Sequence, residues 1–490
     1  MPFLPSRSEP FGILEPLHQY ALTHSEPITR DNWWRLFIIP LAPLFFQAIL
    51  LRRDDTRKWR IPLGVLGISL LWKAALRYRF TQPWLNGFNN GTGIGMLHLT
   101  CRYLEFALLE GPVYDRYYDA KQSRYWWVAA LDVSWNARWI GLGAVDLDHG
   151  GKTSNGHATP SPPNNGHAGL NGHAKATIGD ARLSPPPDGG VEVNGKFIPD
   201  VRAPPSWLPA PTVGRTRFQA VIRHLFIAIR NYIISDTMLS LLRDFGHNTI
   251  GSTDPIPHAL YRFARENRFV VLPHANFGHG LFEASPWVVE FYAVTGVAVC
   301  VWLGISMGYH ACGAICVGSG LWETESWEID MFDSPLLSDS LLDFWGRRWH
   351  QFFRHHFVLV STLILRILHL PVTSPLILAF SFILSGLMHA YGQFLMHPVP
   401  SLLPIASFFL LSGLGCAGEV VFKRITGHKV RGFWGRMWIW FFILLTGRLA
   451  AQAWLESGLG GSLLTYPWAG EIVKGYVREW VVEMVPKGCM

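Results

Sequence analysis

The sequence predicts an all-α, polytopic integral membrane protein with about eight transmembrane helices, in a range of roughly six to ten. Hydrophobic residues make up 49% of the 490 residues, and the mean hydropathy is +0.18. Charged residues make up only 16%, whereas soluble proteins usually carry about 25%. Several apolar runs approach the roughly 20 residues that a helix needs to cross a bilayer.

The first apolar run covers residues 34–51, and a cluster of five basic residues follows it: Arg52, Arg53, Arg57, Lys58 and Arg60. By the positive-inside rule this loop is cytosolic, which places the N-terminus in the lumen. A second candidate crossing begins at Ile61 and is weakened by Lys73. A third and weaker candidate covers residues 93–109.

The stretch 149–196 breaks this pattern, because it is rich in Gly, Pro, Asn and Ser and repeats NGHA from Asn155, Asn165 and Asn171. Such a composition cannot bury enough apolar surface to offset chain entropy, so we expect a disordered loop. A histidine-rich tract can bind metal. Here the histidines lie among flexible glycines, and no cysteine pair has zinc-site spacing, so we expect no metal site.

Residues 216–242 have an amphipathic pattern, so this segment either lies along the membrane surface or crosses at a tilt. Residues 287–322 are long enough for two short crossings, and three more apolar runs begin at Ser374, Leu402 and Trp434. Five basic residues separate the last two runs: Lys423, Arg424, Lys429, Arg431 and Arg436. If that loop is cytosolic, residues 338–357 lie on the same side, provided that 357–370 is a surface or re-entrant helix.

The segment 338–357, SDSLLDFWGRRWHQFFRHHF, combines two tryptophans, three arginines and three histidines between apolar runs. Trp345 and Trp349 are four residues apart, so in a helix they share a face. Arg347 and Arg348 carry guanidinium groups that match phosphate geometry. The segment is therefore either the binding site of a phosphate-bearing, partly apolar cosubstrate such as acyl-CoA or an interfacial helix contacting lipid headgroups.

His389 lies in the apolar run ILSGLMHAYG. An ionisable side chain at membrane depth is costly and marks a functional site. The alternative is a neutral histidine with one hydrogen-bond partner. GISMG at 304–308 matches the nucleophile-elbow pattern, but it lies inside an apolar run rather than at a strand–helix corner. We therefore expect its glycines to serve helix packing and Ser306 not to be a nucleophile.

DFWGRRWHQ, followed by SGLMHA about forty residues later, resembles the wax-synthase-like branch of the membrane-bound O-acyltransferase superfamily. That superfamily has a Trp followed by Asn or His in a polar loop, which Trp349 and His350 match. It has a His in a hydrophobic helix downstream, which His389 matches. The resemblance covers residues 285–454. In chain length and in the sequence around residues 338–357, this protein is most similar to fungal enzymes that acetylate terpenoid or meroterpenoid alcohols. It implies a fold with a buried catalytic tunnel.

The resemblance implies acyl transfer from acyl-CoA, favouring acetyl-CoA, to a hydrophobic alcohol, with no permanently bound cofactor. His389 would be the general base and His350 the oxyanion donor. Arg347 and Arg348 would hold CoA phosphates beside Trp345 and Trp349. The expected partners are acyl-CoA, the alcohol and the bilayer, not nucleic acid. The identity of the alcohol, the acyl length and the oligomeric state stay open.

We expect a multi-pass protein of the endoplasmic reticulum with five regions. These are an N-terminal membrane region with about three crossings (1–148), the loop 149–196, an amphipathic region (197–284), the acyltransferase core (285–456) and a C-terminal tail (457–490). Two alternatives remain. The first is a synthase of long-chain wax or sterol esters, and the second is a non-enzymatic transporter or scaffold, although the internal repeat typical of transporters is missing from the sequence.

Overall fold

The computed structural model describes residues 20, 23–109, 112–144, 190–193, 196–199, 214–266, 269–271, 281–396, 401–463 and 465–484. Apart from residues 190–193 and 196, the stretch 149–196 lies outside the described residues, and so does the prediction of a disordered loop there.

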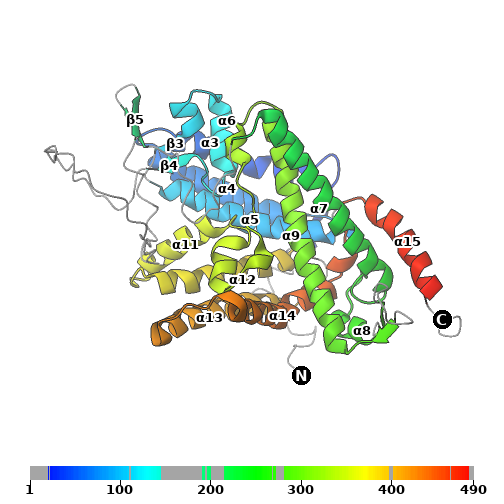
Figure 1. Cartoon of the computed structure of the whole chain (residues 1–490). Coiled ribbons are helices and arrows are strands. Elements are labelled where there is room, and N and C mark those ends of the chain that lie inside the picture. The colour runs from blue at the N-terminus through cyan, green and yellow to red at the C-terminus, as the bar shows by residue number, and fades with distance from the viewer. Residues whose placement is uncertain are drawn as a thin grey trace.

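Helices form most of the described chain, as predicted (Figure 1). The longer helices are α3 (Ala42–Leu51), α4 (Arg57–Arg77), α5 (Asn86–Leu108), α6 (Trp126–Trp135), α7 (Arg217–Phe245), α8 (Ala259–Glu266), α9 (Pro286–Gly318), α11 (Arg354–Ile367), α12 (Ser374–Phe394), α13 (Leu403–Thr426), α14 (Gly432–Glu456) and α15 (Trp468–Met484). The short helices α2 (Trp33–Phe37) and η2 (Ile39–Leu41) precede α3, and Pro40 and Pro43 explain why this first run is broken.

Short strands also occur, and the prediction of purely helical structure missed them. Within the described residues they form four two-stranded sheets. β1 (Glu26–Pro27) pairs in parallel with β2 (Tyr78–Arg79). The antiparallel pairs are β3 (Val113–Asp115) with β4 (Leu142–Ala144), β5 (Gly190–Val193) with β6 (Lys196–Pro199), and β7 (Phe269–Val271) with β8 (Leu281–Glu283). Strands of two to four residues are too short for a recognisable alternating pattern.

Seven helical spans in the described part of the chain are long and apolar enough to cross a membrane. They are Trp33–Leu51, Arg57–Arg77, Arg217–Phe245, Pro286–Gly318, Ser374–Phe394, Leu403–Thr426 and Gly432–Glu456. The chain is therefore a polytopic membrane protein, and the predicted number of about eight is confirmed within its range. The amphipathic segment forms α7, which at 29 residues is long enough to cross.

One crossing prediction was wrong in detail. Residues 287–322 do not form two short crossings, because α9 is one continuous helix of 33 residues. Its interior has no proline, and Gly304 and Gly308 do not interrupt the helical hydrogen bonding. α11, in contrast, is a 14-residue helix and is not among the seven spans, as expected for the segment 357–370.

α5, although 23 residues long, is not among the seven spans. It nevertheless buries Asn90, His98, Arg102 and Glu105. It packs against α4 and α12, while the end of α6 and the start of α11 cover Arg102 and Glu105 with protein rather than lipid. Buried polar groups of this kind need internal partners, and this requirement explains why the apolar pattern of residues 93–109 was weak.

Glycines bring α5 and α12 into close contact. A Cβ atom on Gly93 would lie 2.7 Å from the Cα atom of Gly392, and one on Gly392 would lie 3.0 Å from the oxygen of Asn90. Only residues without a side chain allow this approach. The contact fixes α12, and with it His389, against the interior helix α5.

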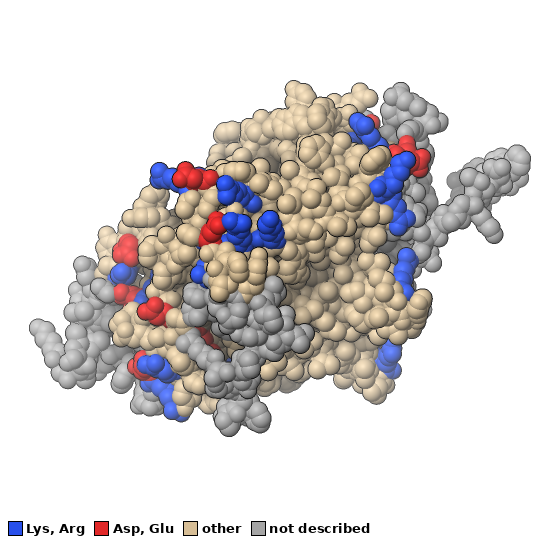
Figure 2. All heavy atoms as spheres, turned by 180° about the vertical axis from the view of Figure 1, so that it is seen from behind, with Lys and Arg blue, Asp and Glu red and all other residues tan. Residues whose placement is uncertain are grey.

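Charged side chains gather towards two opposite edges of the molecule, and a broad band of uncharged residues separates them (Figure 2). Such a band is the surface that a bilayer covers. The structure also places the start of the segment 338–357 beside the loop between α13 and α14, because the amide of Gly432 donates to the Asp339 carboxylate at 3.3 Å. This agrees with the prediction that the segment and the basic loop lie on the same side.

Candidate active site

The segment 338–357 is not one regular helix. It begins with α10 (Leu341–Asp343), which Ser340 caps by accepting a hydrogen bond from the Asp343 amide at 3.0 Å. A π-helix, η7 (Phe344–Arg348), follows, and the Trp349 amide closes it by donating to the Phe344 oxygen at 2.8 Å. Single-turn π-helices are rare and frequently occur at functional sites.

The expectation that Trp345 and Trp349 share one helix face is wrong, because the helix ends before Trp349, which has extended backbone dihedrals. Both side chains nevertheless line one cavity. Trp345 lies among Phe382, Phe408 and Phe409, with ring centroids 6.0 Å from each.

His389 lies on α12 and lines the same cavity. Its Nδ1 atom is 2.8 Å from the backbone oxygen of Ser385. A carbonyl oxygen only accepts, so Nδ1 carries the proton and Nε2 is left as the unprotonated acceptor. The ring of Phe409 stacks on the imidazole at 4.2 Å and fixes its plane. This is the tautomer and the restraint that a general base requires.

His350 lies just after Trp349 and also lines the cavity. The rings of Phe332, Trp349 and Phe353 surround it at 5.5 to 5.8 Å. Burial, and secondarily the neighbouring His389, lower the pKa of His350 to about 3. The imidazole is therefore neutral at physiological pH and holds one N–H that it can donate. The structure thus brings together the two histidines that the sequence singled out.

The cavity has a volume of about 1060 Å³, at the upper end of the range for small-molecule pockets. Its lining is mostly apolar and comes from α5, α6, α7, α9, α12, α13, α14 and the segment 335–353. Neither Arg347 nor Arg348 lines it. An apolar chamber with two histidines in its wall suits a hydrophobic substrate and a reaction that transfers a proton.

The two arginines differ in their surroundings. Arg348 donates to the Asp343 carboxylate at 2.5 Å and to the backbone oxygen of Asp333 at 3.1 Å, so its guanidinium holds the segment together. Arg347 is 48% exposed and lies 3.3 Å from Asp343 and 3.5 Å from Asp333. Of the two, Arg347 is the more available to a phosphate, and the binding of CoA phosphates by this pair stays a prediction.

The predicted packing role of GISMG is wrong for its glycines. Gly304 and Gly308 line the cavity, and a Cβ atom added to either would meet nothing within 4 Å. The serine between them faces the neighbouring helix instead, because Ser306 accepts a hydrogen bond from Asn231 of α7 at 2.9 Å. Ser306 therefore contacts the neighbouring helix, a role that the sequence did not predict, and the glycines border the chamber.

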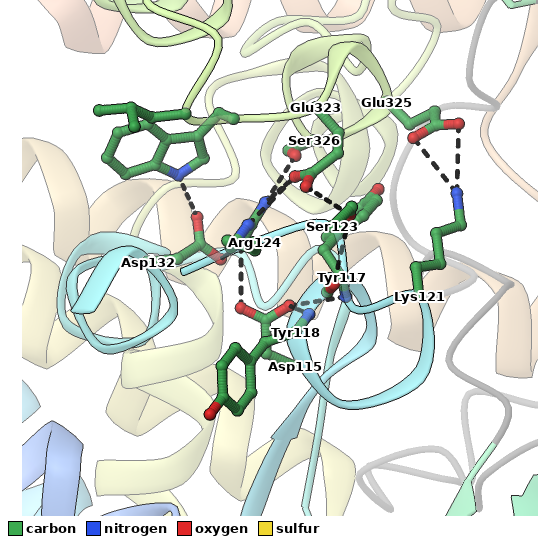
Figure 3. Close-up of polar contacts among 12 residues, drawn as sticks. Asp115, Tyr117, Tyr118, Lys121, Ser123, Arg124, Asp132, Glu323, Glu325 and Ser326 are labelled. Atoms are coloured by element: carbon green, nitrogen blue, oxygen red, sulfur yellow. Dashed lines mark hydrogen bonds and ion pairs between the residues drawn. The ribbon is translucent and has the colours of Figure 1, made fainter. Parts of the chain in front are cut away.

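A network of ion pairs around Arg124 adjoins the cavity through Asp132, and the sequence did not predict it. Arg124 lies 2.9 Å from Asp115, 3.2 Å from Asp132 and 2.5 Å from Glu323. Figure 3 shows these carboxylates converging on Arg124 from the chain around β3 and α6 and from the loop after α9. Asp132 accepts from Trp322 at 2.9 Å, and both of these residues line the cavity.

Two further buried carboxylates hold the segment 338–357, and the sequence analysis missed both. Glu419 of α13 accepts from the amides of Leu341 and Leu342. Glu105 of α5 contacts His355 and His356. A signal for Glu419 existed, because a carboxylate inside the apolar run from Leu402 is as costly at membrane depth as His389 is.

Comparison with known proteins shows that part of the candidate site lies in a region that matches a family model. Residues 327–411 match the model described as "Membrane bound O-acyl transferase family". The chain is 31% identical over 135 residues to "Probable long-chain-alcohol O-fatty-acyltransferase 1" of Arabidopsis thaliana, which is 23% of this chain and 38% of that protein. It is 31% identical over 153 residues to "Acetyltransferase atnC" of Arthrinium sp, which is 28% of this chain and 35% of that protein.

A third relative is "Long-chain-alcohol O-fatty-acyltransferase" of Simmondsia chinensis, at 31% identity over 112 residues, which is 20% of this chain and 30% of that protein. The chain therefore spans only about a third of the length of these relatives. The family match contains His350 and His389 but neither Glu105 nor Glu419.

Proposed function

We propose that this chain, whose residues 327–411 match the model of the membrane bound O-acyl transferase family, is an O-acyltransferase that moves an acyl group from acyl-CoA to the hydroxyl of a hydrophobic alcohol. One observation carries the proposal: the Nδ1 proton of His389 is engaged by Ser385, and its Nε2 atom has no hydrogen-bond partner among the described residues, in a cavity wall shared with His350. This is the arrangement of a general base beside a neutral hydrogen-bond donor.

The reaction follows from these two side chains. His389 Nε2 takes the proton of the alcohol as its oxygen attacks the thioester carbonyl, because a neutral alcohol is a poor nucleophile. The neutral imidazole of His350 donates its N–H to the oxyanion that develops. The carbon–sulfur bond then breaks, the CoA thiolate takes the proton back from His389, and an ester and free CoA are the products. A thiol leaves easily because its pKa is about 8.5.

The donor is proposed to bind with its thioester in the cavity and its phosphates at the surface. Trp345 and Trp349 line the cavity beside the two histidines and offer apolar walls for the acyl and pantetheine groups. Arg347, half exposed at the surface, is proposed to contact a phosphate, with Arg348 fixed next to it. A planar guanidinium suits bidentate phosphate contacts.

Within this function we favour acetyl transfer from acetyl-CoA to a terpenoid-type hydroxyl. A relative named as an acetyltransferase and the roomy apolar cavity support this choice. Esterification of long-chain alcohols is the second candidate, because two relatives are named for it. The proposed location is the endoplasmic reticulum membrane, from which hydrophobic alcohols can partition into the protein.

The test uses the full chain in lipid nanodiscs with radiolabelled acetyl-CoA or palmitoyl-CoA and a panel of hydrophobic alcohols. We expect ester formation by the wild-type protein, with acetyl-CoA preferred for terpenoid alcohols, and none by His389→Gln. A wild-type protein that turns over neither donor would refute the enzyme and favour the transporter or scaffold alternative. Preference for palmitoyl-CoA would instead select the second candidate.

A further inference from the structure

One carboxylate anchors the segment that carries His350 near its N-terminal end. Glu419, 5% exposed, accepts from the Leu341 amide at 2.7 Å and from the Leu342 amide at 3.0 Å. The indole of Trp438 completes the set at 3.0 Å. Three donors converge on Glu419, and two of them are main-chain amides of α10, so α13 holds the backbone of the segment where it begins.

A second carboxylate anchors the segment near its C-terminal end. The Glu105 side chain is fully buried and lies 2.6 Å from His355 Nε2 and 3.3 Å from His356 Nε2. Arg102 pairs with it at 2.8 Å. Buried carboxylates need such partners because a lone one is expensive to remove from water. The two histidine partners, His355 and His356, lie in the first turn of α11, which follows the turn that carries His350.

Arg102 extends this anchor to another wall of the cavity. Its guanidinium also donates to backbone oxygens at the end of α6, namely those of Val133, Ser134 and Asn136. Asn136 lines the cavity. The pair of Arg102 and Glu105 therefore joins the α6 wall to the turn around His350.

His350 depends on these anchors because its own side chain is weakly restrained. Its Nδ1 atom is buried and has no hydrogen-bond partner among the described residues. The aromatic rings of Phe332, Trp349 and Phe353 surround the imidazole. Ring contacts limit the tilt of the imidazole, whereas its position follows the backbone. Gln351 and Arg354 hold that backbone within the segment by donating to the backbone oxygens of Trp349 and Gly346, and Glu419 and Glu105 hold it near its two ends.

We propose that Glu105 and Glu419 are positioning residues that clamp the two ends of the segment 338–357 and thereby hold His350 at the reacting carbonyl. Only the expected effect of these residues on kcat rests on the proposed function; their effect on the backbone of the segment does not. Both glutamates lie outside the residues that match the family model, and they belong to α5 and α13.

The first test measures backbone hydrogen–deuterium exchange in nanodiscs and needs no activity. Glu105→Gln and Glu419→Gln should each speed exchange of the amides between 341 and 356 at least tenfold. The matched control is Glu290→Gln, since Glu290 is another buried carboxylate, paired with Arg448 between α9 and α14. It should leave those amides unchanged. Unchanged exchange in both clamp variants would overturn the clamp.

The second test is a double-mutant cycle with His350→Ala. Each clamp variant should lower kcat at least tenfold, with KM for acyl-CoA and for the alcohol changed less than twofold. In the His350→Ala background the same substitutions should lower kcat less than threefold, because the residue they position is gone. Equal losses in both backgrounds would overturn the positioning role. An inactive wild type would contradict the proposed function, while exchange still decides the clamp.

Milder variants guard against misfolding. Trp438→Phe removes one of the three donors to Glu419, and His356→Phe removes one partner of Glu105. Each keeps its carboxylate paired with its remaining partners. Both should raise exchange between 341 and 356 by an intermediate amount of about threefold, and no increase in either would count against the clamp.

Discussion

The Nδ1 atom of His389 lies 2.8 Å from the backbone oxygen of Ser385, one turn earlier on the same helix. Because the partner belongs to the main chain, no substitution at Ser385 removes it. The fold of α12 therefore fixes the tautomer, and Nε2 remains the basic atom.

Replacing His389 with Gln should abolish acyl transfer. Gln keeps a hydrogen-bonding side chain but cannot take a proton at neutral pH, and loss of a general base costs about 10²–10⁴ in rate. Single-turnover rates in nanodiscs measure the effect, and His428→Gln, at an exposed position after α13, is the matched control. Near wild-type turnover by His389→Gln would refute the base assignment.

Arg347→Ala and Arg348→Ala should both raise KM for acyl-CoA more than KM for the alcohol. A lost charge-assisted contact costs about 1.5–3 kcal/mol, or roughly ten- to a hundredfold. Arg348→Ala should also lower the unfolding temperature, because Arg348 bonds to Asp343 and to the Asp333 backbone. Initial-rate kinetics and thermal unfolding separate the two effects. An unchanged KM for acyl-CoA in both variants would leave the interfacial-helix interpretation.

Gly304→Leu should narrow the cavity without disturbing the helix, because a Cβ atom there meets nothing within 4 Å. We expect transfer to bulky polycyclic alcohols to fall at least tenfold relative to transfer to short linear alcohols. Gly313→Ala is the contrasting variant, since its Cβ would lie 2.9 Å from the His224 ring. It should lower stability and leave the ranking of alcohols unchanged. Competition between two alcohols in one reaction measures the ratio.

Mild acid should destabilise the protein partly through two buried histidines. Burial lowers the pKa of His350 to about 3, and burial, opposed by Glu105, lowers the pKa of His356 to about 4. Free histidine has a pKa of about 6.5, so below that pH the unfolded chain binds more protons than the folded chain. The free energy of unfolding therefore decreases as the pH is lowered below about 6.5, by at most about 1.4 kcal/mol per pH unit for each histidine.

Thermal unfolding between pH 7 and pH 5 tests this dependence. The His350→Gln, His356→Gln double variant should lose less stability over this range than the wild type, whereas His428→Gln should follow the wild type. A double variant with the same slope as the wild type would show that these two histidines do not set the acid sensitivity.

Several features could be predicted from the sequence because they depend on local pattern. The apolar runs identified most crossings, and the resemblance of DFWGRRWHQ and SGLMHA to a known superfamily pointed to His350 and His389, two side chains that share one cavity. The course of α9 was mispredicted, because length alone allowed two short crossings. The glycines at 304 and 308 were assigned to packing because sequence spacing does not reveal whether a neighbouring helix or an empty chamber faces them.

The ion pairs that hold the site together could not be predicted from the sequence, for a different reason. Glu105 meets His355 across 250 positions of sequence, and Arg124 meets Glu323 across 199. Such pairings depend on how helices far apart in the chain come together, which no short pattern encodes. Polar residues in α5 made that segment a poor membrane crossing, and the same residues form the anchors of the site.

The Arg124 network has a consequence for anyone who wishes to exchange parts between related proteins. Grafting residues 285–456 alone into a relative would separate Glu323 from Arg124, because Arg124 lies outside the graft, and leave the Glu323 carboxylate without the guanidinium that it pairs with here. A transplant that also carries residues 112–144 keeps both sides of the network. The part of this protein that must be exchanged together is therefore discontinuous along the chain, because it combines residues 112–144 with residues 285–456.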